Sequence, residues 1–177
     1  MTPGTATGAT ADRLERARAL VATVCDPELP PLTLVDLGIL RSVRAEAGTV
    51  VVTVTPTYSG CPAVEYIEDE IRRTLEAAGI GPVRVVRSYA PAWTTDWVTD
   101  EGRRKLADLG IAPPRPAVAT GRDAGVPVAL GGRPGSPPCP RCGSTAVEEL
   151  SRFSSTACKA LYRCTACSEP FDHVKEI

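Results

Sequence analysis

The chain has 177 residues, 43% of them hydrophobic, and a formal net charge of −1. This composition is typical of a folded protein and excludes a general electrostatic attraction to nucleic acid or to an anionic membrane. No apolar run reaches the ~20 residues that span a bilayer, and Met1–Thr10 lacks the apolar core of a secretory signal. We therefore expect a cytoplasmic protein whose seven cysteines are metal ligands or free thiols.

The first part of the chain predicts one α+β domain, after an N-terminus, Met1–Thr10, that is expected to be disordered. Apolar residues at helical spacing predict helices, and valine-rich runs predict strands. In chain order the expected elements are a helix over Ala11–Val24, strands over Ile39–Ala45 and Thr49–Thr55, a helix from Pro62 to Ala78, a strand over Val83–Tyr89 and a short helix over Thr99–Leu109. This order predicts a small mixed sheet with flanking helices over residues 11–112.

Cys61 stands at the turn between the second expected strand and the helix that follows it. Pro62 suits the first position of a helix, because its missing N–H has no partner there in any case. Cys61 is therefore expected near the helix N-cap, where unpaired N–H groups and the helix dipole favour the thiolate form. The alternative is a small apolar residue packed under a tight turn.

Little else in this domain supports conventional nucleophilic catalysis by Cys61. The one histidine, His173, lies far along the chain, and no nucleotide-binding glycine loop is present. Asp26 and Glu28, in a proline-rich turn, are candidates to join Cys61, because a thiolate with oxygen ligands suits a transient iron or iron–sulfur site better than hydrolysis. The alternative for Asp26, taken alone, is a helix or turn cap.

The last part of the chain carries a metal-binding pattern, after a proline- and glycine-rich segment, 113–138, that predicts a linker. Two C-x-x-C pairs are separated by 21 residues: Cys139, Cys142, Cys164 and Cys167. Four thiolates around one tetrahedral ion predict structural zinc in a zinc ribbon over residues 139–177. A redox pair or a rubredoxin-like iron site stays open, since sequence does not separate them well.

The ribbon is expected to contain three strands, Val147–Arg152, Lys159–Tyr162 and Pro170–Val174. Gly143 follows the first cysteine pair as its tight turn prefers, but Ser168 follows the second. Acidic and basic residues balance from Cys139 onward, so no basic footprint for nucleic acid exists.

Several further residues stay open between two interpretations. Cys158 is a packed or free thiol, or else a spare ligand, and His173 has a role beside the ligands or at the surface. Trp93 and Trp97 belong to a packed core or to a ledge that faces a partner. No role is assigned to Cys25.

Several motifs together resemble a known family. The segments 26–30 (Asp-Pro-Glu-Leu-Pro), 36–38 (Asp-Leu-Gly) and 55–62 (Thr-Pro-Thr-Tyr-Ser-Gly-Cys-Pro) resemble the small α+β domain of iron–sulfur cluster assembly factors. With 90–97 (Ala-Pro-Ala-Trp-Thr-Thr-Asp-Trp) and 155–164 (Ser-Thr-Ala-Cys-Lys-Ala-Leu-Tyr-Arg-Cys), the chain is similar to the family of D-type components of bacterial phenylacetyl-CoA epoxidase. Ser154 and Ser168 stand where that pattern has glycines.

The resemblance implies an accessory or maturation factor in aerobic phenylacetate breakdown, which is not itself the oxygenase. It implies that Cys61 holds a transferred iron–sulfur cluster or iron, shaped by Asp26 and Glu28, with zinc in the ribbon. The implied partners are the oxygenase and reductase subunits, and a homodimer would bring two copies of Cys61 together. Neither nucleic acid nor membrane is expected as a partner. The alternative is a structural subunit that links oxygenase and reductase through the ribbon.

Overall fold

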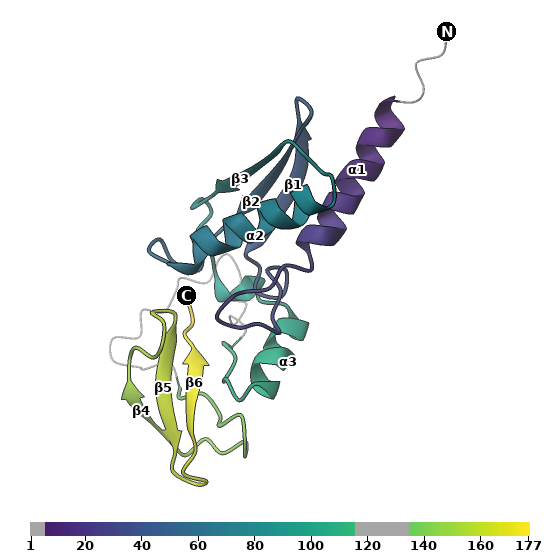
Figure 1. Cartoon of the computed structure of the whole chain (residues 1–177). Helices are drawn as coiled ribbons and strands as arrows, with labels where there is room; N and C mark the ends of the chain where they lie inside the picture. The colour runs from purple at the N-terminus through teal and green to yellow at the C-terminus, as the bar shows by residue number, and fades with distance from the viewer. Residues whose placement is uncertain (1–5, 116–134) are drawn as a thin grey trace, which may run out of the picture. The chain divides into compact units, whose positions relative to one another are not determined.

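The computed structural model describes residues 6–115 and 135–177, which form two compact units (Figure 1). The first unit runs to Trp93 and includes Trp97–Gly102. The second unit comprises Thr94–Asp96 together with the chain from Arg103 to Ile177. These units divide the chain differently from the expected domain ranges, 11–112 and 139–177, because Thr94–Asp96 and the chain from Arg103 onward group with the ribbon.

The first unit has the predicted α+β fold with a mixed sheet (Figure 1). Strand β2 is central, antiparallel to β1 and parallel to β3. Helix α1 contacts β1 and α2, and α2 contacts β3. The elements of this unit are α1 (Ala6–Val21), β1 (Leu40–Glu46), β2 (Thr49–Val54), α2 (Ala63–Ala77) and β3 (Val83–Arg87). The 3-10 turn η1 (Thr95–Trp97) and helix α3 (Asp100–Asp108) follow, and each includes residues of both units.

The core of the first unit is formed by apolar residues at the two expected periods. Val50, Val52 and Val54 of β2 are buried on one face, and Val51 is buried on the other. Ile67, Ile71 and Leu75 are buried at steps of four along α2. The hairpin between β1 and β2 turns through Ala47 and Gly48, both with positive φ, which is the backbone of a type I′ turn.

One expectation for the N-terminus is wrong. Helix α1 begins at Ala6, so residues 6–10, expected to be disordered, form its first turns, and it ends at Val21 instead of Val24. Alanine has the highest helix propensity, and three alanines stand between residues 6 and 11 with no proline among them. Residues 1–5 lie outside the described residues.

Trp93 and Trp97 both contact the Asp-Leu-Gly motif of residues 36–38. The Trp93 indole N–H donates to the carbonyl oxygen of Leu37 at 2.9 Å, and Trp93 is 4% exposed, which confirms the packed-core interpretation for that residue. Gly38 has a φ of +66°, and a Cβ there would lie 2.4 Å from the Trp97 Cβ. Gly102 is similarly close to the Asp36 carbonyl oxygen. These contacts leave no room for side chains at the two glycines.

The second unit contains the three expected strands, β4 (Val147–Ser151), β5 (Lys159–Cys164) and β6 (Pro170–Val174), as an antiparallel sheet (Figure 1). Its β6 edge pairs with Ala112, whose N–H donates to Asp172 O at 2.8 Å and whose carbonyl accepts from Val174 N–H at 3.1 Å. Of the expected linker, residues 116–134 lie outside the described residues.

Candidate metal centre and thiol site

The four cysteines of the ribbon converge on one point. Their sulfur atoms all lie within 4.8 Å of one another. The Cys139 and Cys167 sulfurs are 3.8 Å apart, and those of Cys142 and Cys164 are 3.6 Å apart. A tetrahedron with metal–sulfur bonds of ~2.3 Å has edges of about 3.8 Å, so the donors fit a single zinc ion. Because four thiolates fill the tetrahedron, no coordination position stays open for a substrate.

The four cysteines lie in two turns that share one backbone hydrogen-bond pattern. The Cys139 N–H donates to Ser144 O, and the Cys164 N–H donates to Glu169 O, each at 2.9 Å and each five residues along. Gly143 and Ser168 occupy matching places and both have positive φ, +74° and +62°. Ser168 therefore adopts the glycine-like conformation that its position requires, at a cost in backbone strain.

The thiols of Cys164 and Cys167 differ in pKa because their hydrogen bonds and their surroundings differ. The backbone N–H groups of Cys167 and Ala166 lower the pKa of Cys164 to about 7. The backbone N–H of Glu169 acts in the same direction on Cys167, but burial and the neighbouring thiols raise the pKa of Cys167 to about 12. A metal cation that binds all four sulfurs must displace such protons.

The ligand turns rest on a small apolar core. Ala112, Phe171 and the ligands Cys139 and Cys164 are buried together, with Val147 and Tyr162 packed against them. The Tyr162 ring stacks on Phe171 with a centroid distance of 5.8 Å. Such a small core favours a structural role for the metal.

Cys61 lies two residues before Ala63, the first residue of α2, with Pro62 between them. Its carbonyl accepts from the Val64 N–H at 3.4 Å, and its own N–H donates to the Tyr58 carbonyl at 3.3 Å. Pro62 is the N-cap rather than the first helical residue, although its φ of −69° is already helical. The half-buried thiol thus belongs to the residue that precedes the N-terminus of a 15-residue helix, where backbone N–H groups lack helical partners.

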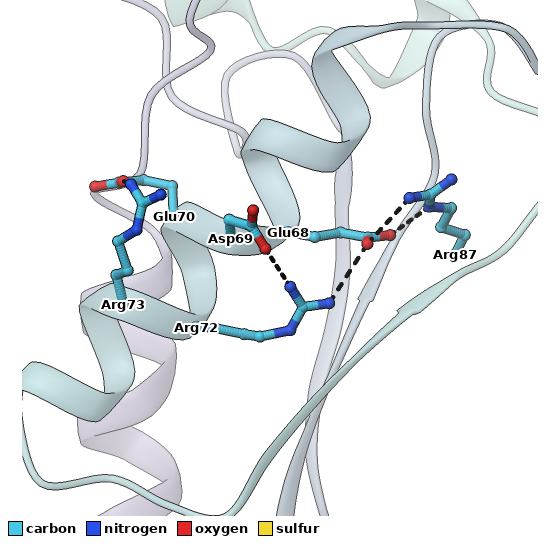
Figure 2. A network of polar contacts seen from close by, with 6 residues as sticks. All are labelled: Glu68, Asp69, Glu70, Arg72, Arg73 and Arg87. Atoms are coloured by element: carbon cyan, nitrogen blue, oxygen red, sulfur yellow. Dashed lines mark hydrogen bonds and ion pairs between the residues drawn. The ribbon is translucent and has the colours of Figure 1, made fainter.

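An ion-pair network holds α2 against the end of β3 (Figure 2). Glu68, which is 8% exposed, receives two contacts from Arg87, one of them from Nη2 to Oε2 at 3.1 Å, and a third from Arg72 at 3.5 Å. The hydrogen bond with Glu68 raises the pKa of Arg87. Arg87 pairs with Val54, the last residue of β2. The network therefore fixes α2 near the C-terminal end of β2, from which the Cys61 loop departs. No sequence motif pointed to this network.

Asp26 forms the turn cap that sequence reasoning named as its alternative. One carboxylate oxygen of Asp26 accepts from the N–H groups of Glu28 and Leu29, at 2.9 and 3.0 Å. Asp26 is 9% exposed, whereas Glu28 is exposed. Coordination by Asp26, Glu28 and Cys61 stays a prediction.

His173, Cys158 and Cys25 each make a polar contact with a residue that is not a proposed metal ligand. His173 is 3% exposed, with Nδ1 at 3.1 Å from Ala112 O and Nε2 at 3.4 Å from Glu176 Oε2, so it lies in the interior and not at the surface. The Cys158 sulfur lies 3.1 Å from the Thr156 hydroxyl, and the Cys25 sulfur lies 3.6 Å from Thr23 O. Within the described ranges, no helix is long and apolar enough to cross a bilayer.

Two family models match the chain. The model described as "Iron-sulfur cluster assembly protein" covers residues 14–86, a range that contains Asp26 and Cys61. The model described as "PaaD zinc beta ribbon domain" covers residues 123–175, a range that contains all four clustered cysteines.

Individual proteins are similar to the chain over different lengths. A Bacillus anthracis crystal structure of "Domain of Unknown Function DUF59" has 24% identity and a TM-score of 0.49, covering 54% of this chain and 92% of its own. A Porphyromonas gingivalis "Fe-S protein maturation auxiliary factor" is 39% identical over 59 residues, 33% of this chain and 55% of that protein. An Escherichia coli (strain K12) protein, named as the D-type component of a "Putative 1,2-phenylacetyl-CoA epoxidase", is 45% identical over 157 residues, 89% of each chain. With both domain matches in the same order, the chain belongs to the PaaD family of 1,2-phenylacetyl-CoA epoxidase components.

Proposed function

We propose that this chain is a non-catalytic maturation factor for the metal centres of a phenylacetyl-CoA epoxidase. In this role Cys61 takes up iron or an iron–sulfur cluster and passes it to an oxygenase or reductase subunit. The observation that carries the proposal is the position of Cys61 at the N-terminus of α2, within the range matched by the iron–sulfur assembly family.

The chemistry of that position supports the proposal. Thiolates are the usual ligands of iron–sulfur clusters, and a helix N-terminus favours a thiolate over a thiol. A carrier must also release its cargo, so one thiolate with weaker oxygen partners suits transfer better than a closed four-cysteine site. Asp26 and Glu28 are the proposed oxygen partners, and Asp26 would combine this role with its turn cap.

The ribbon has a different task in this proposal. Its four sulfurs fit zinc, and a filled tetrahedron offers stability without exchange. We infer that zinc is structural there, and that the cargo binds at the Cys61 site and not at the ribbon. One cysteine per chain is too few for a cluster, so two copies joined through the cargo would complete the ligand set. All seven cysteines lie among the described residues and none of them forms a disulfide, which is compatible with a cytoplasmic location.

The test is anaerobic reconstitution with iron and sulfide, followed by metal analysis and absorption spectroscopy. Wild type, Cys61→Ser and Cys25→Ser are compared, because Cys25 is another half-buried cysteine of the first unit. We expect about one zinc per chain in all three proteins, from the single four-cysteine site. A sulfide-to-iron absorption band is expected in wild type and Cys25→Ser but not in Cys61→Ser.

Activity in cells separates the proposal from its rival, a structural subunit that links oxygenase and reductase. A carrier predicts that Cys61→Ser lowers the iron content and the activity of the epoxidase while the complex still assembles. A linker predicts normal iron content in that variant. Zinc without iron in reconstituted wild type, together with normal epoxidase activity in Cys61→Ser, would refute the carrier role.

A further inference from the structure

His173, on β6, is buried and uses both nitrogens of its ring. Its Nδ1 lies 3.1 Å from the carbonyl oxygen of Ala112, and because a carbonyl can only accept, Nδ1 donates in this hydrogen bond. Its Nε2 lies 3.4 Å from Glu176 Oε2, a contact that needs one proton between the two groups. Because both nitrogens have partners, neither is available to coordinate a metal ion. The contribution of His173 therefore comes from what it holds in place.

Ala112 is held at the edge of β6 by three hydrogen bonds. Its N–H donates to Asp172 O at 2.8 Å, and its carbonyl accepts from Val174 N–H at 3.1 Å. The His173 ring supplies the third bond, to the same carbonyl. Ala112 pairs with β6 as an isolated bridge outside the named strands, so neighbouring residues of a ladder do not reinforce it. The side-chain bond from His173 is therefore a large part of what keeps Ala112 in register.

Ala112 belongs to the apolar core that also contains two of the four clustered cysteines. It is fully buried in one cluster with Phe171, Cys139 and Cys164. These two cysteines are the buried members of the four, and each comes from a different ligand turn. A residue that holds Ala112 in place therefore acts on one ligand of each turn.

A second connection between His173 and this core runs through aromatic rings. The His173 ring lies edge-on to Tyr162, with a centroid distance of 5.7 Å and an interplanar angle of 80°. Tyr162 in turn stacks on Phe171, which belongs to the core cluster. Edge-to-face and stacked pairs at such distances are stabilising and have preferred orientations. His173 thus contacts both Ala112 and Tyr162, and each of them packs in or against the core of the ligands.

Glu176 connects His173 to the rest of the segment that contains Ala112. Glu176 Oε1 accepts from Arg115 N–H at 3.3 Å, while Oε2 faces His173. Burial alone would raise the pKa of Glu176, but its own N–H, the Arg115 N–H and His173 hold this pKa below its usual range. We call residues 112–115 the strap segment. His173 and Glu176 together bind the first and the last residue of this segment.

We propose that His173 is a positioning residue for the zinc site, because it keeps the strap segment and Tyr162 packed against the two buried ligands. The inference rests on the proposed function, in which the ribbon holds structural zinc. Cys139 and Cys164 receive this support, whereas the other two cysteines of the site are exposed. The site is therefore not complete within its two C-x-x-C turns. Its retention of metal depends on a side chain outside the turns and on a segment that precedes the ribbon in sequence.

The test measures how fast a chromogenic chelator removes zinc from the zinc-loaded full chain. We expect removal from His173→Ala to be at least about fivefold faster than from wild type, the factor that one lost hydrogen bond gives. His173→Asn keeps a side-chain N–H for Ala112, and His173→Phe keeps a ring beside Tyr162, so each should give an intermediate rate. The matched control is Glu148→Gln, at an exposed carboxylate of β4 that pairs with Arg163, which should behave as wild type.

Two results of this comparison would overturn the proposal. One is removal of zinc from His173→Ala at a rate within twofold of the control. The other is a rate for both His173→Asn and His173→Phe that equals the rate for His173→Ala. If His173→Ala fails to fold, the other two variants are compared with wild type directly, and wild-type rates in both would overturn the proposal.

Cobalt substitution gives a readout that a general loss of stability would not change. The visible absorption bands of Co²⁺ bound by four thiolates depend on the geometry of the ligands. We expect these bands to shift in His173→Ala, to recover in part in His173→Asn, and to stay unchanged in Glu148→Gln. Unchanged bands in His173→Ala would mean that the residue stabilises the fold without positioning the ligands. Bands typical of three thiolates and one imidazole in wild type would make His173 a ligand and would also overturn the proposal.

Metal analysis of wild type separates this inference from the proposed function. If wild type holds about one zinc per chain, the proposal of structural zinc stands, and equal rates of removal refute the positioning role alone. If wild type holds no zinc in the ribbon, both fail. Iron uptake in the presence of sulfide is measured on the same His173 variants. It should match wild type, because Cys61 belongs to the first unit.

Discussion

Ser168 is a serine in a backbone conformation that favours glycine, in the second of the two ligand turns. A left-handed conformation costs about 1–2 kcal/mol for a residue with a side chain, and glycine loses about 0.5–1 kcal/mol through chain entropy. We therefore expect Ser168→Gly to raise the stability of the zinc-loaded ribbon by about 0.5–1 kcal/mol. Thermal unfolding of the loaded protein measures this.

The paired control for Ser168→Gly is Gly143→Ala in the first turn. A Cβ at Gly143 would meet nothing within 4 Å, so only its φ of +74° opposes a side chain. Gly143→Ala should destabilise by about 1 kcal/mol. A lower melting temperature for Ser168→Gly would contradict the strain assigned to that turn.

Gly38 has a positive φ and, unlike the other described glycines with positive φ, it also has no space for a side chain. Gly38→Ala would place a Cβ 2.4 Å from the Trp97 Cβ, and we expect a loss of about 3 kcal/mol in the free energy of unfolding. Gly48→Ala, with a φ of +81° and an open surrounding, should cost about 1 kcal/mol. Chemical denaturation of both variants separates steric overlap from backbone strain, and equal losses would refute the close approach.

At the scale of elements, the packing of α2 against β3 depends on the carboxylate of Glu68, which is almost fully buried. Arg87→Ala would leave Glu68 with Arg72 alone, and an under-compensated buried charge is destabilising. We expect a drop of several degrees in melting temperature. Arg73→Ala removes an exposed pair with Glu70 on the same helix and should change little. Similar melting temperatures for the two variants would mean that the network does not hold α2.

The zinc affinity of the ribbon should depend on pH. The pKa of Cys167 is raised to about 12, so this thiol keeps its proton near neutral pH until a metal displaces it. Zinc affinity should therefore fall as the pH falls, and zinc binding should release protons. Titration calorimetry in buffers of different ionisation enthalpy measures that release. Affinity that does not change between about pH 6 and 8 would argue against coordination by thiolates.

At the scale of the whole molecule, two units with separate cores should respond separately to loss of zinc. Cys142→Ser removes an exposed ligand, and we expect residues 139–177 to lose protection from hydrogen exchange. Strands β1–β3 should keep their protection, because their valine core lies within the first unit. Unfolding of both units together would contradict this independence.

Sequence patterns predicted the elements and the clustering of four cysteines because both depend on local information. The four-residue spacing of Ile67, Ile71 and Leu75 corresponds directly to the buried face of α2. The spacing of two C-x-x-C pairs is itself the geometry of two ligand turns, so it identified the four sulfurs that converge. The proline after Cys61 likewise marked the start of α2 to within one residue.

Contacts between residues that lie far apart in the sequence could not be predicted. Nothing near Glu68 in sequence indicates that Arg87 will meet it, because the register of β3 beside β2 decides that contact. The extent of α1 was underestimated because residues 6–10 carry no amphipathic pattern.

The pairing of Ala112 with β6 bears on how such proteins can exchange parts during evolution. Together with the bonds from Thr94 and Thr95 to Ile177 O, it makes the second unit discontinuous in sequence. A recombination event at the proline-rich segment would separate the ribbon from the residues that complete its sheet. Lineages that shuffle this tail should therefore inherit Ala112 with it, because the N–H and carbonyl groups of Ala112 pair with the β6 edge.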